Sequence, residues 1–393
     1  MNILFLQRSI AGFGGVMVVT NTLAKKMIEE GHNVSQVVFL QPNEYAISQM
    51  DKRIHQYVIG SLNFSSENIK SFKKVLVKEK VDIIINQWGL NLQMGRLLKK
   101  GIKGTGIKVI SVYHNQPDKN GRIVNIENQL KCDISKAKRA VKLIELLAFK
   151  ILTSYSFRYI YRISDLFMVL SDRFIPIFKK VSWMNNPKKL ISQTNPLTID
   201  NKEFVYDFNK KKMQIIYVGR LDETQKCVSR ILAIWRELCG VLPNWNLKLV
   251  GDGPDRKLYE QYIDKNGLKN ISIEGFCNPL EYYKESSILL LTSNFEGFPL
   301  VLAEAMSFGV IPIVYGSYEA IYDIIDDNNG FIIRAQNEDE LRSEFIDHIL
   351  LLAHNKVLRQ EMALHAIEQA MNYSIDYVYK KWNYYLNVLF KKK

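Results

Sequence analysis

The sequence predicts an α/β protein built from two strand–helix halves, and three observations lead to this prediction. The chain has 393 residues, which is too long for one ordinary α/β domain. Short apolar runs alternate with helical segments, as in a mostly parallel sheet with crossover helices. Each half opens with a strand, a turn and a helix, so two Rossmann-like halves are expected.

The first half is predicted to cover residues 1–197. A strand at 2–7 leads into the loop SIAGFGG, and a helical pattern follows with apolar side chains at i, i+3, i+7 and i+11 from Val16. Gly31 suits the end of that helix. Further apolar runs that suit strands lie at 34–40, 81–85, 107–112 and 166–170.

The second half is predicted to cover residues 198–373, with a linker segment at 195–212. The last segment, 374–393, is aromatic and basic. It could form a final helix, and its residues alone leave open which half it packs on. The predicted elements of the second half are a strand at 213–218, a helix at 228–238, and strands at 247–250, 271–274, 288–291, 310–314 and 331–333.

Composition limits the function. The formal net charge is +13 and the pI is about 9.3, which favours nucleic acid, anionic lipid or a phosphate-bearing substrate as partner. No aromatic and basic recognition motif supports nucleic acid. Four cysteines without metal-ligand or disulfide spacing fit a reducing cytoplasm. Because neither a signal peptide nor an apolar run of about 20 residues is present, we expect a cytoplasmic protein, soluble or on a membrane surface.

The stretch SNFEGFPLVLAEAM at 293–306 carries the clearest chemical signal. A strand leads in and a helix leads out, with Pro299 suited to the first helical position. Glu296 is expected on the loop and Glu304 about a turn and a half into the helix. Free N–H groups at a helix start favour phosphate, and two carboxylates suit hydroxyl groups, so we predict a nucleotide-sugar site. The alternative is a loop acid near the helix dipole and a solvated helical acid.

A charged pair lies in YVGRLDETQK. Arg220 comes just after a predicted strand and Lys226 just before a predicted helix, where cations can bind a diphosphate and stabilise its charge as it leaves. The alternative is two surface cations on an ordinary loop. The turn GDGPDR at 251–256 is interpreted as scaffold, because a Pro at the helix start explains it.

The first half offers weaker candidates. Gly14 and Gly15 would let the backbone approach a sugar or acceptor closely, although many such turns need glycine for geometry only. His114 follows a predicted strand end, where ligands bind in open α/β sheets. A hydrogen-bonded structural histidine is the alternative.

Residues 136–162 hold seven basic side chains against one acid. Such a segment can rest on anionic lipid headgroups as an amphipathic helix. The alternative is a crossover helix that packs on the core and keeps a solvated basic face. The apolar positions at helical spacing are Val141, Ile144, Ala148, Ile151 and Tyr155.

Together these motifs resemble the retaining glycosyltransferases of family four, which have the GT-B fold of two Rossmann-like domains facing a central cleft. The resemblance covers most of the chain and rests on the order of the motifs. In the first half these are the glycine loop, EEGHNV, His114, the Ser164 and Asp165 pair before LFMVLS, and Asn195 with Pro196. In the second half they are IIYVGRLDETQK, LVGDGP, IEGF and EGFPLVLAEAMSFGVIP.

The resemblance implies roles for the matched residues of the second half. Arg220 and Lys226 would bind the donor diphosphate, and Glu304 would hold the ribose hydroxyls. Glu296 would hold the donor sugar together with neighbouring backbone amides. These amides surround Gly297 and Phe298.

For the first half, the resemblance implies that His114 would reach the donor sugar and the reaction centre. Gly14 and Gly15 would border the cleft. The final helix, 374–393, would cross back onto the first domain. The implied catalytic residues are therefore His114, Glu296, Arg220 and Lys226.

The implied activity is a retaining sugar transfer that uses neither a metal nor a cofactor, and the sequence contains no Asp-x-Asp pair to hold a metal on the diphosphate. We expect a hexose or N-acetylhexosamine to move from a nucleotide sugar to a growing glycan, and the resemblance favours a UDP-linked donor. Lipid-linked saccharides of capsule, O-antigen or exopolysaccharide, on polyprenyl diphosphate, are the favoured acceptors. Peripheral binding at the inner face of the plasma membrane would follow. The alternative is a non-catalytic GT-B subunit that binds glycan or a partner glycosyltransferase.

Three segments depart from the family pattern. Cys227 stands where the family usually has glycine. Residues 315–325 replace a Gly-Gly-x-x-Glu pattern, with Asp323 the nearest acid. Residues 115–135 match no motif, and we expect acceptor specificity to lie there.

Overall fold

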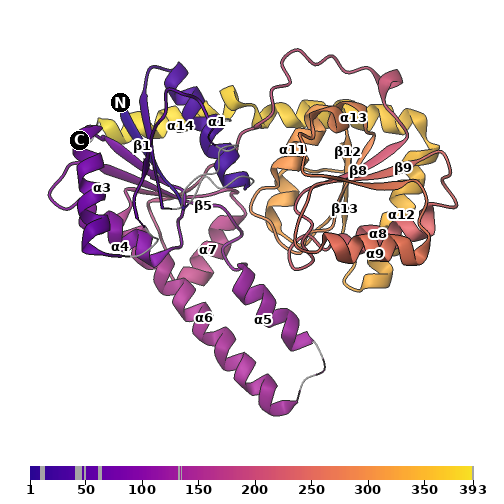
Figure 1. The fold of residues 1–393 in the computed structure, drawn as a ribbon, viewed down its shortest axis with the longest axis horizontal. Coiled ribbons are helices and arrows are strands. Elements are labelled where there is room, and N and C mark those ends of the chain that lie inside the picture. The colour runs from indigo at the N-terminus through magenta and orange to yellow at the C-terminus, as the bar shows by residue number, and fades with distance from the viewer. Residues whose placement is uncertain are drawn as a thin grey trace. The chain divides into compact units, whose positions relative to one another are not determined.

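A computed structural model describes residues 1–8, 14–39, 47, 50–60, 64–131, 133 and 135–391. The chain divides into two compact units. The first unit is Met1–Thr198 with Ile375–Lys393, and the second is Ile199–Ser374. Each unit holds a parallel sheet with helices packed around it (Figure 1), which confirms the predicted fold of two Rossmann-like halves.

The described part of the first unit forms a seven-stranded sheet in the order β3-β2-β1-β4-β5-β6-β7. Its strands are β1 (Asn2–Leu6), β2 (Asn33–Val38), β3 (His55–Val58), β4 (Ile83–Asn86), β5 (Lys108–Tyr113), β6 (Leu166–Val169) and β7 (Leu190–Ser192). The helices between them are α1 (Gly15–Glu29), α3 (Ser66–Lys78), α4 (Leu92–Gly101), α5 (Gly121–Lys131), α6 (Lys136–Ile163) and α7 (Phe174–Ser182).

The strand order of this sheet reverses between β1 and β4, where Ile3 pairs with Ile83. Ligands of open α/β folds bind at such a reversal, outside the carboxyl ends of the strands. Gly14 lies beyond β1, Gln87 directly follows β4, and His114 directly follows β5. The candidate residues of the first half therefore lie along this edge of the sheet.

The described part of the second unit forms a six-stranded parallel sheet in the order β10-β9-β8-β11-β12-β13. Its strands are β8 (Gln214–Val218), β9 (Asn246–Val250), β10 (Ile271–Gly275), β11 (Ile288–Leu291), β12 (Ile311–Tyr315) and β13 (Phe331–Ile333). Its α-helices are α8 (Val228–Leu238), α9 (Arg256–Asn266), α10 (Leu280–Glu285), α11 (Leu300–Ser307), α12 (Glu338–His354) and α13 (Lys356–Ala370).

The order of the second sheet reverses between β8 and β11, where Ile288 pairs with Ile215. Arg220 and Lys226 lie in the loop after β8, and Glu296 lies in the loop after β11. The topology therefore brings together two segments that lie far apart in the sequence.

A buried core anchors the loop that carries Arg220 and Lys226. Ile215 and Tyr217 of β8 and Ile231 and Trp235 of α8 are all buried in one cluster. Full burial of such a side chain contributes roughly 1.5–3 kcal/mol. Both ends of the loop are therefore held by packed elements.

The final helix, α14 (Ile375–Phe390), belongs to the first unit and packs on α1. Lys26 Nζ lies 2.7 Å from Asp376 Oδ1, and His32 Nε2 lies 3.1 Å from Tyr379 Oη. Trp382, also on α14, is buried. The chain thus enters the second unit once and then returns to the first.

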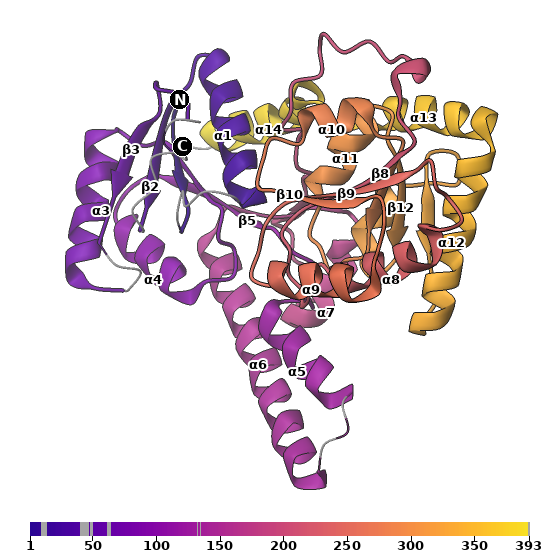
Figure 2. The ribbon, with the colours of Figure 1, turned by 45° about the vertical axis from the view of Figure 1, so that its right-hand side comes forward.

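Helices α5 and α6 lie side by side and project away from the sheet of the first unit (Figures 1 and 2). Much of the segment 115–135, which matched no sequence motif, is therefore helical; residues 132 and 134 lie outside the described residues. Among the helices described, none has the length and apolar character to cross a bilayer.

Candidate active site

The sequence-predicted site residues are divided between the two units. The first unit carries Gly14, Gly15 and His114, and the second carries Arg220, Lys226, Glu296, Gly297, Phe298 and Glu304.

Lys226 and Glu296 contact each other in the second unit. Lys226 Nζ donates a hydrogen bond to Glu296 Oε1, and the two side chains are only 15% and 9% exposed. A buried carboxylate is costly unless it is paired. The lysine therefore offsets the cost of burying Glu296 at the point where β8 and β11 end.

Glu304 lies on α11 and is 6% exposed, so the alternative of a solvated helical glutamate is wrong. Tyr283 Oη donates a hydrogen bond of 3.2 Å to Glu304 Oε2. Burial, and then the charge of Glu304, hold the pKa of Tyr283 well above its usual range. Tyr283 therefore remains a hydrogen-bond donor. Its contact with Glu304 could not be predicted from the sequence, because 21 positions separate the two residues.

The loop between Glu296 and α11 carries two buried amides. Within the described residues, the backbone N–H groups of Gly297 and Phe298 donate to no backbone carbonyl, and both residues are buried. The Phe298 ring packs on Tyr373 with 5.1 Å between ring centroids. The sequence predicted Pro299 as the first helical residue of α11, but it is the N-cap of that helix. Since buried N–H groups seek an acceptor, these amides are available to a ligand.

Arg220 is more exposed than Lys226, with 57% of its side chain accessible. Its Nη2 lies 2.9 Å from Asp222 Oδ2. Gln225 Nε2 donates a 3.2 Å hydrogen bond to Phe295 O, which ties the loop after β8 to the loop after β11. Arg220 therefore presents an exposed guanidinium from a loop whose backbone is tied to its neighbour.

The turn GDGPDR supports the same loop, in agreement with the scaffold interpretation. A Cβ atom on Gly251 would lie 1.8 Å from Gly219 O, and one on Gly253 would lie 2.2 Å from Leu221 O. Only glycine permits so close an approach of two backbones. These glycines therefore hold the Arg220 loop in place.

Cys227 adopts a left-handed backbone conformation, with φ 49° and ψ 53°, that glycine adopts at lower cost. Its Sγ donates a 3.1 Å hydrogen bond to Glu223 O and accepts one of 2.8 Å from Asn294 Nδ2. These contacts offset backbone strain. The turn after Lys226 thus has a conformation suited to glycine although a cysteine occupies it.

Two buried hydroxyl groups of the second unit were missed by the sequence analysis. Within the described residues, Tyr318 Oη and Ser293 Oγ have no hydrogen-bond partner, and both residues are buried. Burial, and then the charge of Glu296, hold the pKa of Tyr318 well above its usual range. An orphaned buried polar group costs about 1–3 kcal/mol. The one available signal was that Tyr318 lies in the segment 315–325, which departs from the family pattern.

In the first unit, His114 Nε2 lies 2.7 Å from Gln87 Oε1. Burial lowers the pKa of His114 to about 4, so the ring is neutral at physiological pH. With Gln87 Oε1 as the acceptor, Nε2 carries the hydrogen and Nδ1 is left as an acceptor. Within the described residues, neither His114 Nδ1 nor Gln87 Nε2 has a partner. His114 is thus hydrogen-bonded, as expected for a structural histidine. Its Nδ1 atom nevertheless has no partner among the described residues.

Gly14 is the N-cap of α1 and Gly15 is its first residue. No atom of the described residues lies within 4 Å of a Cβ built on Gly14, and its φ of −98° is accessible to any residue. Neither packing nor backbone conformation within the described residues requires glycine at position 14. Residues 9–13 of the predicted SIAGFGG loop lie outside the described residues.

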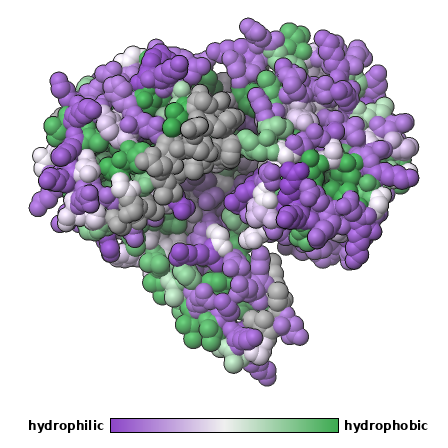
Figure 3. Space-filling model, in the orientation of Figure 1, coloured by the Kyte–Doolittle hydropathy of each residue, from purple (hydrophilic) through white to green (hydrophobic). Residues whose placement is uncertain are grey.

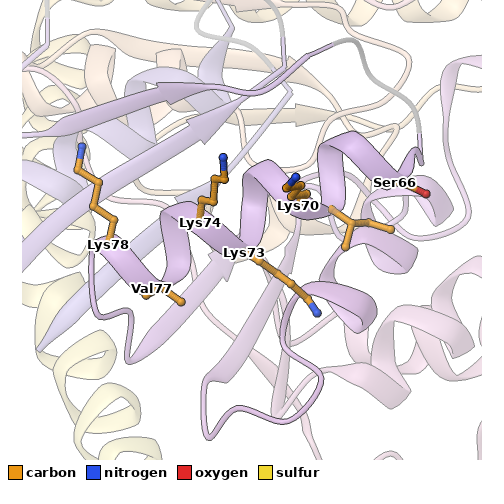
Figure 4. Close-up of a pocket in the computed structure, with 7 residues that line it drawn as sticks. Ser66, Lys70, Lys73, Lys74, Val77 and Lys78 are labelled. Atoms are coloured by element: carbon orange, nitrogen blue, oxygen red, sulfur yellow. The ribbon is translucent and has the colours of Figure 1, made fainter.

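A hollow on α3 is lined by none of these residues. It is lined by one helix, and Lys73 points away from Lys74 and Lys78 (Figure 4). Because its cations do not converge, the hollow has no feature of a built anion site. Its lining residues are Ser66, Ile69, Lys70, Lys73, Lys74, Val77 and Lys78.

Comparison with known proteins relates the chain to glycosyltransferases. A family model described as Glycosyl transferases group 1 matches residues 198–369, somewhat less than half of the chain. The amylovoran biosynthesis glycosyltransferase AmsD of Erwinia amylovora is 29% identical over 202 residues, which cover 50% of this chain and 55% of AmsD. A Campylobacter jejuni N-acetyl-D-galactosaminyltransferase is 26% identical over 184 residues, which cover 47% of this chain and 50% of the Campylobacter enzyme. The chain thus spans about half the length of these curated relatives.

Among solved structures, Anabaena HepE in complex with UDP and glucose is similar along the whole chain. The TM-score is 0.72 at 15% identity, and the match covers 99% of this chain and 100% of HepE. At this identity the likeness shows the fold alone. The chain therefore has the GT-B fold, and the family match in its second unit, with the relatives above, supports a glycosyltransferase.

Proposed function

We propose that the chain is a retaining glycosyltransferase of family four. It moves a hexose or N-acetylhexosamine from a UDP-sugar to a growing, lipid-linked glycan of capsule, O-antigen or exopolysaccharide. One observation carries the proposal. Lys226 and Glu296 contact each other in the loops at the strand-order reversal of the second unit, and the buried Glu304 lies on α11, the helix that follows.

The second unit supplies a group for each part of the donor. Arg220 and Lys226 bind the diphosphate through charge-assisted hydrogen bonds. Glu304 accepts hydrogen bonds from the ribose hydroxyls, and Tyr283 positions its carboxylate by donating to Oε2. Glu296 and the amides of Gly297 and Phe298 bind the donor sugar. Tyr318 donates its unpaired hydroxyl hydrogen to the same ligand.

The proposed reaction needs only these groups. The bond between the anomeric carbon and the diphosphate oxygen breaks, and the acceptor oxygen bonds to that carbon on the vacated face. The acceptor proton passes to a diphosphate oxygen, so the anomeric configuration is retained. Arg220 and Lys226 stabilise the charge that grows on the diphosphate, and no step requires a bound metal or a cofactor.

In the first unit, Gln87 positions His114. Its carbonyl fixes the hydrogen of His114 on Nε2, so that Nδ1 accepts a hydrogen bond from a sugar hydroxyl. Gly14 and Gly15 leave room for the sugar or the acceptor beside α1. Gln87 is thus a positioning residue, and His114 is the residue that contacts substrate.

Two relatives support the acceptor class. AmsD is named for amylovoran biosynthesis, and the name of the Campylobacter enzyme includes a saccharide on PP-undecaprenol. A polyprenyl-diphosphate acceptor suits a chain with a net charge of +13. We place the enzyme in the cytoplasm, bound peripherally at the inner face of the plasma membrane through residues 136–162, with no nucleic-acid partner.

The test is transfer and UDP release with a panel of UDP- and GDP-sugars and polyprenyl-diphosphate saccharides. We expect activity with a UDP-sugar and its loss in Glu304→Ala. Lys284→Ala, which removes an exposed cation of α10, is the matched control and should remain active. If the chain binds a glycan but transfers no sugar from any donor, the alternative of a non-catalytic GT-B subunit replaces this proposal.

A further inference from the structure

Helix α6 exposes a broad apolar face. Its first half projects from the unit beside α5, and hydrophobic residues gather along the α6 side of this projection (Figure 3). At helical spacing these side chains fall on one half of the helix surface. Those that are at least 45% exposed are Val141, Leu143, Ile144, Leu147, Ile151, Leu152 and Tyr155.

The opposite face of the same helix is covered by α5, with which α6 makes its most extensive helix contact. Lys142, Glu145, Leu146 and Phe149, which recur at i, i+3, i+4 and i+7, are partly buried there. From Thr153 onward the helix packs into the unit and buries Phe157. The core-packing alternative from the sequence is therefore right for the second half of α6 and wrong for the first.

Cations stand at both ends of the exposed face. Lys136 lies two turns before Ile144, and Arg158 and Arg162 continue the line from Tyr155 at i+3 and i+7. Long basic side chains can lie along apolar surface and extend their charge to headgroups. The acid of this helix, Glu145, lies on the α5 side and pairs with Lys142 at 2.7 Å. The exposed face thus carries no carboxylate.

We propose that this face of α6 binds the surface of an anionic lipid bilayer. The apolar side chains from Val141 to Tyr155 span about 21 Å along the helix, and they would lie among the acyl chains while the flanking cations meet anionic headgroups. A second copy of the chain fits this face less well, because pairing two such helices would bring their cations together.

The functional purpose of this membrane binding rests on the lipid-linked acceptor proposed above. The binding itself does not depend on catalysis. A helix held flat on the bilayer would keep the first unit next to an acceptor whose lipid tail cannot leave the membrane. Binding would confine enzyme and acceptor to one surface and so raise their effective concentration.

Vesicle flotation with the full chain tests the proposal. Vesicles of equimolar phosphatidylcholine and phosphatidylglycerol are compared with vesicles of phosphatidylcholine alone, at low and high salt. Ile144→Glu with Leu147→Glu introduces two acids on the exposed face. The matched control is Val357→Glu with Leu364→Glu, which makes the same change of charge at two exposed apolar positions of α13, 66% and 50% exposed.

We expect the wild type and the control to float with anionic vesicles, and the α6 variant to lose bound fraction by a factor on the order of ten or more. Salt should weaken the binding. No flotation, equal binding to both kinds of vesicle, or equal binding by the α6 variant would each overturn the proposal. A dimer in sedimentation that only the α6 variant abolishes would also overturn it in favour of self-association. Binding of a UDP-sugar, measured on the same proteins without vesicles, tests the proposed function separately and should be unchanged in the α6 variant.

Discussion

Lys226 and Glu296 form a buried ion pair between two loops that lie 70 positions apart in the sequence. The pair joins the residue proposed to bind the diphosphate to the residue proposed to bind the sugar. A bound donor would offer Lys226 a second anion and Glu296 a set of hydroxyl groups. The two ends of the donor are therefore coupled through one contact.

This coupling predicts a non-additive effect on stability. Lys226→Met leaves the Glu296 carboxylate buried without its cation, and such losses cost about 3–5 kcal/mol. The double variant Lys226→Met with Glu296→Gln should be more stable than Lys226→Met alone, because neither charge remains. Unfolding free energies from urea titration of the wild type and the three variants provide the measurement. Strictly additive changes in unfolding free energy would contradict an energetic coupling between Lys226 and Glu296.

Tyr318→Phe is expected to weaken donor binding without destabilising the fold. Its hydroxyl has no partner among the described residues, so its removal relieves an unsatisfied group and takes a hydrogen bond from the ligand. Affinity for the UDP-sugar should fall roughly 5- to 30-fold, as for one lost hydrogen bond of about 1–2 kcal/mol.

Tyr206→Phe is the control for this prediction. Its hydroxyl is also buried and unpartnered within the described residues, but its ring packs at Gly309 and lies under Lys211, away from the proposed site. Calorimetric titration should find the affinity of this variant unchanged. Equal affinities for the two variants would remove Tyr318 from the donor site.

The neutral state of His114 predicts a dependence of stability on pH. Its pKa is lowered from 6.5 to about 4 in the folded state, so the unfolded chain binds more protons between these values. The stability that this difference contributes is fully present above pH 6.5 and is lost as pH falls toward 4, by up to about 3 kcal/mol. His114→Gln should flatten the loss of unfolding free energy between about pH 7 and about pH 4.5. An unchanged pH profile in this variant would contradict a neutral His114 in the folded state.

Cys227 provides a test of backbone strain beside the diphosphate loop. Cys227→Ala keeps the left-handed conformation and loses both Sγ contacts, whereas Cys227→Gly loses the contacts but relieves the strain. The glycine variant should be more stable than the alanine variant by about 1 kcal/mol. Thermal unfolding of the two variants measures the difference, and an alanine variant at least as stable as the glycine variant would argue against strain at this position.

Much of the fold could be predicted from the sequence because its central strands are buried on both faces. Runs such as those at 83–85 and 288–291 are continuously apolar, and such a run predicts a buried strand from the sequence alone. Strands β3 and β7 were missed. β3 is a half-exposed edge strand with the sequence HQYV, and β7 has three residues, so neither offers a clear period.

The candidate site could be predicted only where a motif carries it. Glu296 and Lys226 belong to sequence patterns, and the structure brings them into contact. Gln87 and Tyr283 have no local signal, because their roles depend on partners that are distant in the sequence. Tyr318 has only the signal that its segment departs from the family pattern, and the sequence does not show that its hydroxyl lacks a partner among the described residues. The sequence likewise did not decide between a membrane-binding and a core-packing α6, because it could not show which face of the helix α5 would cover.

Binding of nucleotide sugars tests the central claim most directly. Titration calorimetry of the full chain with UDP-sugars and GDP-sugars, on the wild type and on Glu304→Ala, measures donor binding without any assumption about the acceptor. The proposed function predicts saturable binding of a UDP-sugar by the wild type and a loss of at least about tenfold in affinity in the variant, because the ribose hydroxyls lose a charged acceptor. Failure of every nucleotide sugar to bind the wild type, or equal affinity in Glu304→Ala, would contradict it.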